Sequence, residues 1–302
     1  MATNKALILP VLAVILIFVI SFPSHDAFAA SFDIKDQASC ESLPSGSPSW
    51  DSTTNTCTVT NFALTLESTD FFTIENGISF RVFNGTIDSH GTINMLGASD
   101  GTTLRITNEA QAVTNIATSG LLTFENGNFN NFGTVNIHGV LNGKGATWSN
   151  SGQINVFRQF GGEVININDV EGTITVSNGA TLVSNEGSII NNGFIDNHGL
   201  VVGPCSVITN NNGATINNTG TIQNESGCSF FNNHGAINNF GTFNNTLRAT
   251  ITNSGGTVNN SGVVNNENNS TVDNTNGTIT DNCGGTINNS GIFKGNPVVN
   301  SC

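Results

Sequence analysis

The chain of 302 residues has no tyrosine and few charged residues, and most of its charges are acidic. Only 10% of the residues are charged, well below the share in ordinary globular proteins. Lysine and arginine total 8 against 21 aspartates and glutamates, a formal net charge of −13. A protein that binds nucleic acid neutralises phosphates with basic side chains. The composition therefore predicts no nucleic-acid partner.

The common metal-binding spacings are also missing. None of the 6 cysteines forms a Cys-x-x-Cys pair, and no Gly-Gly-x-Gly-x-Asp calcium repeat occurs. His90, His138, His198 and His234 each precede a glycine, which allows a metal-binding ladder. Their separations of 48, 60 and 36 residues do not fit one column of a repeating structure. We favour the simpler interpretation that histidine tolerates a turn conformation there, and we expect no metal and no cofactor.

The chain is rich in one short sequence motif, called the phrase below, which is repeated from about residue 172 to residue 295. It reads Gly-Ala-Ile-Asn-Asn-Phe at 235–240 and Gly-Thr-Ile-Asn-Asn-Ser at 285–290. Thr, Ile and Val favour extended backbone, whereas Asn and Gly readily adopt positive φ. Each phrase therefore predicts one short strand closed by a turn. Such a strand buries little alone, so the copies are expected to stack around a shared core.

The predicted fold is all-β: a single-stranded, right-handed parallel β-helix (β-solenoid) with disulfide-stapled ends. Three phrases give a coil of about 20 residues with three walls, and two phrases give a flatter coil of about 14 residues. We favour three walls because Phe230, Phe231, Phe240 and Phe243 need interior width. Asparagines at equivalent turns are expected to form amide ladders, and a disordered Asn-rich tail is the alternative. The central aliphatic residues are expected to face inward: Ile174, Ile189, Ile195, Ile216, Ile222, Ile237, Val258, Ile279 and Ile287.

Residues 1–29 are predicted to be a signal peptide. Lys5 is followed by an apolar run over 6–22, and Ala27-Phe28-Ala29 provides a small-x-small cleavage site. A retained membrane anchor is the alternative, but the run is at the short end for a span. The segment resembles export signals of secreted archaeal proteins. We expect a secreted or cell-surface protein without a permanent membrane span.

Residues 30–61 are predicted to be an N-terminal cap, 62–282 the β-helix repeats and 283–302 a C-terminal cap. Cys40 and Cys57 enclose a loop with Trp50, which we expect to cover the apolar end of the stack. Together with Gly46 and Thr58, these residues resemble the N-terminal ends of a family of secreted prokaryotic β-helix surface proteins. That family more often has two glycines directly before the tryptophan. The resemblance implies the fold and secretion. The phrase loosens over residues 98–119, where 109–112 are expected to form a loop or a helical turn, and residues 158–162 are expected to form a second irregular loop.

The remaining cysteines are spaced by one predicted coil. Cys205 and Cys228 are 23 residues apart, and Cys283 and Cys302 are 19 apart. Stacked neighbours lie about 4.8 Å from each other, within the Cα separation of about 4.4–6.8 Å that a disulfide needs. Six cysteines allow 15 connectivities. Coil geometry favours Cys205–Cys228 and Cys283–Cys302, and the predicted export makes a Cys40–Cys57 disulfide permissible, closing the N-terminal loop. Zinc binding is the rival interpretation.

The leading function is non-catalytic: a structural or adhesion-type protein whose polar Asn and Thr walls bind carbohydrate, cell-envelope components or sister molecules. Because β-helices also host polysaccharide lyases and glycosidases, an enzyme is the first alternative. The closest carboxylate cluster is Glu163, Asp169 and Glu171, near Arg158, but the other basic residues are scattered. An ice-binding surface is a further alternative, since Thr-x-Thr phrases occur at 173–175, 250–252 and 278–280.

Glycosylation is expected at some of the Asn-x-Ser/Thr sequons. A glycan requires an outward-pointing asparagine, and stacked coils cannot all carry sugars in one column. The favoured candidates are Asn84, Asn268 and Asn269. The full set of sequons is Asn84, Asn217, Asn224, Asn244, Asn259, Asn268, Asn269, Asn276 and Asn288.

Overall fold

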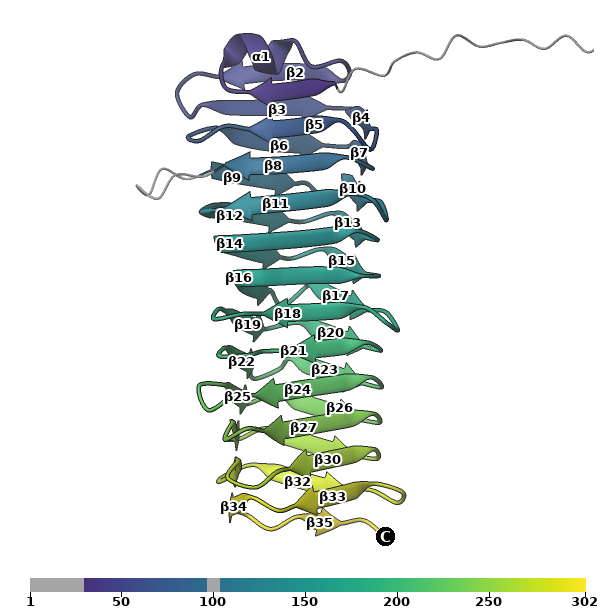
Figure 1. Cartoon of the computed structure of the whole chain (residues 1–302), viewed down its shortest axis with the longest axis vertical. Coiled ribbons are helices and arrows are strands. Elements are labelled where there is room, and N and C mark those ends of the chain that lie inside the picture. The colour runs from purple at the N-terminus through teal and green to yellow at the C-terminus, as the bar shows by residue number, and fades with distance from the viewer. Residues whose placement is uncertain (1–29, 97–103) are drawn as a thin grey trace, which may run out of the picture.

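The computed structural model describes residues 30–96 and 104–302, so the predicted signal peptide lies outside the described residues. The chain forms a rod of stacked parallel coils with the first and last described strands at opposite ends (Figure 1). Each coil contributes one short strand to each of three walls. The predicted all-β parallel solenoid with three walls is confirmed. Among the described residues, no helix is long and apolar enough to span a membrane.

Wall 1 is a separate 12-stranded parallel sheet. Its strands are β4 (Ala63–Leu66), β7 (Thr86–Ser89), β10 (Val113–Ile116), β13 (Thr134–Ile137), β15 (Gln153–Val156), β17 (Thr173–Val176), β20 (Phe194–Asn197), β23 (Thr215–Asn218), β26 (Ala236–Asn239), β29 (Thr257–Asn260), β32 (Thr278–Asp281) and β35 (Val299–Asn300).

Walls 2 and 3 are joined in one sheet because β14 (Val140–Asn150) and β16 (Gln159–Asn168) run continuously from one to the other. Wall 2 also contains β1 (Ser31–Ile34), β5 (Phe71–Ile74), β8 (Thr92–Leu96), β11 (Leu121–Glu125), β18 (Thr181–Ser184), β21 (Leu200–Val202), β24 (Thr221–Glu225), β27 (Thr242–Thr246), β30 (Val263–Asn266) and β33 (Thr286–Asn289). Wall 3 also contains β3 (Thr56–Thr60), β6 (Ser79–Phe83), β9 (Leu104–Asn108), β12 (Gly127–Asn131), β19 (Ser188–Asn191), β22 (Val207–Asn210), β25 (Phe230–Asn233), β28 (Thr250–Asn253), β31 (Thr271–Asn274) and β34 (Ile292–Gly295).

The strands alternate between inward and outward side chains, so a four-residue strand buries its second and fourth residues. Equivalent residues from Asn197 on β20 to Asp281 on β32 are 21 residues apart, close to the predicted coil length. Of the nine predicted core aliphatics, eight are at most 5% exposed, and Ile287 packs partly buried against the core.

Two of the four phenylalanines used to argue for three walls lie outside the core. Phe231 and Phe243 are buried, but Phe230 is 45% exposed and Phe240 is 60% exposed. Phe230 precedes Phe231 on β25, and neighbouring residues of a strand face opposite sides. Phe240 occupies the turn after β26. The expectation that all four face inward was wrong, although the three-walled architecture is confirmed.

From β19 to β31, the fourth position of most strands holds an asparagine whose amide is buried and bonded to the next coil. The longest such ladder follows wall 3, where each Nδ2 donates to the Oδ1 of the following rung at 2.8–2.9 Å. Its rungs are Asn108, Asn131, Asn150, Asn168, Asn191, Asn210, Asn233, Asn253 and Asn274. Shorter ladders follow wall 1 from Asn197 to Asp281 and wall 2 from Asn224 to Asn289. The predicted amide ladders are therefore present.

The repeating glycines fall into two physical classes. At the short turns, a Cβ on Gly241 would lie 2.1 Å from the carbonyl oxygen of Gly220, and one on Gly262 would lie 2.1 Å from that of Gly241. Neither glycine has a positive φ. The left-handed conformation occurs instead at longer turns, as at Gly213, where φ is 83°. The short turns thus select glycine because stacked turns approach each other closely.

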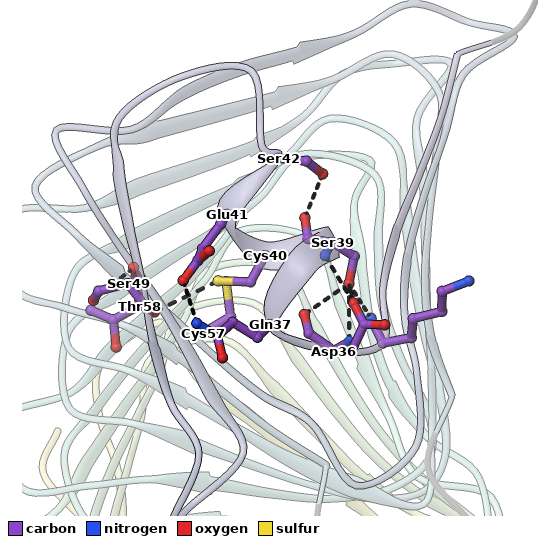
Figure 2. The surroundings of a disulfide bond; sticks show 10 residues. Asp36, Gln37, Ser39, Cys40, Glu41, Ser42, Ser49, Cys57 and Thr58 are labelled. Atoms are coloured by element: carbon purple, nitrogen blue, oxygen red, sulfur yellow. Dashed lines mark hydrogen bonds between the residues drawn. A yellow bond between two sulfur atoms is a disulfide. The ribbon is translucent and has the colours of Figure 1, made fainter.

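The N-terminal end of the rod carries the short helix α1 (Gln37–Glu41) and the strand β2 (Ser47–Asp51), which pairs antiparallel with β3 (Figure 1). Asp36 caps α1 by accepting a hydrogen bond from the Ser39 backbone at 2.9 Å, and the bonds from Ser39 lower the pKa of the Asp36 carboxyl. The Cys40–Cys57 disulfide ties the helix to β3 (Figure 2). Trp50 packs partly buried against the core.

Three disulfides are present. The Cα atoms are 5.7 Å apart in Cys40–Cys57, 4.6 Å in Cys205–Cys228 and 5.3 Å in Cys283–Cys302. The last two join neighbouring coils at exposed turns. The described part of the chain has no free cysteine. Residues 158–162, predicted to be a loop, are largely in β16, and the segment 109–112 forms a turn between β9 and β10.

One inward position breaks the apolar pattern and gives a testable result. Asn166 on β16 is 2% exposed, lies between Trp148 and Ile189 in the column, and neither polar atom of its amide has a hydrogen-bond partner. A buried, unpaired amide costs about 1–3 kcal/mol. We expect Asn166→Val to raise the free energy of unfolding by about that amount, measured by urea denaturation. An unchanged or lowered midpoint would contradict this explanation.

Candidate functional surface

The carboxylates that sequence suggested for catalysis lie on the outside of the rod. Glu163 is exposed at the bend of β16, and Asp169 follows the end of that strand. Six residues of extended chain separate them, a distance of about 20 Å, whereas a glycosidase pair needs about 5–10 Å. Asp169 accepts a hydrogen bond from Ser151 at 2.8 Å, and Glu171 lies exposed in the same turn. The three carboxylates do not form one site.

The four histidines lie at two different corners. His90, His138 and His198 follow wall 1 strands, whereas His234 follows β25 on wall 3. His138 stacks on Phe157 with ring centroids 4.1 Å apart, and His198 lies 3.2 Å from Asp196 and 2.6 Å from Thr219. Within the described ranges, no three His, Cys, Asp or Glu side chains gather closely enough to hold a metal ion.

The outer faces of walls 1 and 2 carry rows of half-buried amides that run along the rod. On wall 1 the Asn136, Asn155, Asn238 and Asn259 amides each donate to the residue one coil earlier, at 2.7–3.0 Å. On wall 2 an equivalent row follows Gln223, Asn244, Asn265 and Asn288. We call these rows the outer amide rows.

The Thr-x-Thr phrases do not build a continuous threonine surface. Residues 173–175 and 278–280 lie on wall 1, but 250–252 lies on wall 3. On wall 1 the neighbouring phrases place threonine at the first outward position and asparagine at the third, as in β23 and β29. A flat wall of paired threonines is therefore not formed.

Wall 3 changes character along the rod. In its middle coils the outward residues are mainly apolar. Ile165, Val207 and Phe230 lie in one column, in which Ser188 stands between Ile165 and Val207. Their exposed fractions are 44%, 38% and 45%. Toward the N-terminal end the same wall becomes polar and contains a groove.

This groove has a volume of about 490 Å³ and crosses the outer face of wall 3 in the first coils. Thr54 and Thr56 line one part, Arg81 lies on β6, and Glu109 and Phe132 come from the turns after β9 and β12. We call it the Arg81 groove. Its size is within the usual range of about 300–1,000 Å³ for ligand sites.

Arg81 is held from two sides. Its Nε donates to Glu109 Oε1 at 2.5 Å, and its Cζ lies 4.3 Å from the centre of the Phe83 ring. In the part of the chain that the structure describes, this is the one ion pair between a carboxylate and a lysine or arginine. Arg81 and Phe83 both point outward because they are two residues apart on β6, whose pattern is alternating.

Sequence reasoning missed this groove. Arg81 and Glu109 are separated by 28 residues, and only the coil length brings them together. The one local signal was Phe132, an aromatic side chain in a turn position, where the repeat more often has a polar residue; it is 46% exposed.

The chain is similar to a solved structure, and the two other comparisons found no match. No protein-family model and no curated protein matches the chain. Among solved structures, the chain is similar to one described as "Crystal structure of TibC-catalyzed hyper-glycosylated TibA55-350 fragment". The alignment has 16% identity and a TM-score of 0.34, and covers 90% of this chain and 100% of the other. The strand register of this chain itself defines a parallel β-solenoid.

Proposed function

We propose that the protein is a secreted, non-catalytic β-solenoid with a structural and adhesive role at or near the cell surface, and that it binds carbohydrate through its outer walls. The N-terminal sequence pattern and the three disulfides support an oxidising, extracellular location.

The outer amide rows carry the proposal for carbohydrate. A primary amide has two N–H donors and an oxygen with two lone pairs. Within a row, an interior residue such as Asn238 or Asn244 uses one N–H and one lone pair for its neighbours. One donor and one lone pair remain on each residue, repeated about every 4.8 Å along the rod. Sugar hydroxyls both donate and accept, so a polysaccharide laid along a row can bond repeatedly, and many weak contacts sum to useful avidity.

Retention on insoluble polysaccharides tests this function. The purified protein should be retained by at least one of cellulose, chitin or mannan. The triple variant Asn217→Ala, Asn238→Ala, Asn259→Ala should lose several-fold of that retention, because it removes the C-terminal part of the outer amide row on wall 1. A matched triple variant of exposed turn residues, Asn178→Ala, Asn212→Ala, Asn268→Ala, should be retained like the wild type. Absence of wild-type retention on all three supports would contradict the proposal.

We further propose that the protein is glycosylated and that its glycans are confined to the turns. Asn84, Asn268 and Asn269 are exposed in turns, whereas Asn224 is 1% exposed and bonded in a buried ladder. A sugar on Asn224 would have no room between stacked coils. Peptide mapping of protein from a glycosylating host is expected to find sugar at Asn268 or Asn269 and none at Asn224. Modified Asn224, or an unmodified intact mass, would count against this.

A further inference from the structure

We propose that the Arg81 groove is a binding subsite for a neutral hexose unit of a polysaccharide. The inference rests on the proposed carbohydrate-binding function and assigns it a specific site. The groove differs from the rest of the outer surface because it combines an aromatic ring, an ion pair and hydroxyl groups in one concave place.

The groove is organised before a ligand arrives. The Arg81 guanidinium is fixed by Glu109 and by the Phe83 ring, and the Glu109 backbone N–H donates to the Val82 carbonyl at 3.1 Å. Arg81, Val82 and Phe83 belong to β6, and Glu109 lies in the short turn after β9 on the neighbouring coil. Binding therefore orders few additional side chains, which keeps the entropic cost low.

The polar groups match the chemistry of a sugar. Within the described part of the chain, the terminal amino groups of Arg81 and the Oε2 of Glu109 make no hydrogen bond. The amino groups can donate to one sugar hydroxyl, and the carboxylate can accept from a neighbouring one. Hydrogen bonds with a charged partner are about twice as strong as neutral ones.

Phe132 provides the apolar contact. Its ring is 46% exposed at the edge of the groove. The C–H face of a pyranose ring is apolar, so packing it on this ring removes apolar surface of both from water. Thr54, Thr56 and Ser79 also line the groove, and the Thr54 hydroxyl donates to Asp51 Oδ2 at 2.9 Å and lies 2.8 Å from the Thr56 hydroxyl.

The charges of the groove and of the whole chain favour a neutral sugar over an acidic one. The guanidinium charge of Arg81 is balanced by Glu109 at 2.5 Å, so this pair presents no net charge to the ligand. The whole chain has a net charge of −13, which repels acidic polymers at low salt. An acidic oligosaccharide should therefore bind more weakly than a neutral one of the same length.

Isothermal titration of the full chain with four hexasaccharides tests the assignment. Cellohexaose, chitohexaose and mannohexaose are the neutral probes, and hexagalacturonate is the acidic one. At least one neutral probe should bind, and Arg81→Met and Phe132→Ala should each weaken it tenfold or more. The matched variants Arg158→Met and Phe240→Ala change an exposed arginine and an exposed phenylalanine elsewhere and should leave the affinity unchanged. Melting curves verify folding, and Glu109→Gln serves as a second variant if Arg81→Met is unstable.

The outcomes separate the two proposals. If the neutral probe binds wild type and both groove variants equally, the groove assignment is wrong while carbohydrate binding stands. Tighter binding of hexagalacturonate overturns the neutral class. If the wild type binds none of the four probes, the subsite is rejected, and retention on the insoluble polysaccharides decides the broader function separately.

Discussion

Replacing Ile237 with aspartate is expected to prevent stable folding of the C-terminal half of the rod. Ile237 is 0% exposed on β26 and stacks between Ile216 and Val258 of the neighbouring coils. An aspartate there would be a buried charge with no partner, which costs about 3–5 kcal/mol. In a solenoid each coil is stabilised by its neighbours, so the defect also weakens the coils on either side. Urea denaturation followed by circular dichroism measures the loss.

The matched control lies one residue earlier on the same strand. Ala236 faces outward, beside Thr215 and Thr257. Ala236→Asp introduces the same charge on the opposite face, where water solvates it, and surface changes of this kind usually stay within about 0.5 kcal/mol. If Ile237→Asp were as stable as Ala236→Asp, the assignment of inward and outward faces would be wrong.

The fold could be predicted from the sequence because its determinants are local and repeated. The phrase at 235–240 specifies one strand and one turn, and the same phrase recurs one coil later. Repetition fixes both the inward aliphatic position and the asparagine ladder position, and the spacing of Cys205 and Cys228 matches one coil. The structure pairs these two cysteines accordingly.

Features that depend on which coils become neighbours could not be predicted. Arg81 meets Glu109 only because the coil between them has a particular length. Coil lengths vary: stacked neighbours are 18 residues apart at Asn150 and Asn168, 23 at Asn168 and Asn191, and 29 at Thr92 and Leu121, so a fixed period does not give the register. The direction of Phe230 was misjudged for a related reason: two adjacent phenylalanines do not reveal which one starts the inward alternation.

The prediction of turns at the repeated glycines was correct, but the reason given for glycine, its tolerance of positive φ, does not apply at the short turns. Positive φ predicts turns, but the column through Gly220, Gly241 and Gly262 is selected by the contact between successive turns. That contact exists only in the stack, so a single phrase does not reveal it.

A buried rung of the long amide ladder is expected to be as important as an aliphatic core residue. Asn168 is 0% exposed, and its Nδ2 donates to Asn191 Oδ1 at 2.8 Å and to the carbonyl oxygens of Gly172 and Phe194 at 3.0 Å. Its Oδ1 accepts from Asn150 at 2.9 Å. Asn168→Val would leave one N–H of Asn150 and the Oδ1 of Asn191 buried without partners.

Each orphaned group costs about 1–3 kcal/mol, so Asn168→Val should lower the free energy of unfolding by about 2–6 kcal/mol. The comparison with Asn166→Val is decisive, because both residues are buried asparagines on β16, two positions apart. One amide is fully bonded within the ladder, and the other has no partner. The same substitution should therefore destabilise the protein at 168 and stabilise it at 166. Denaturation midpoints that move in the same direction for both variants would show that burial alone, and not hydrogen bonding along the ladder, determines the contribution of asparagine to this core.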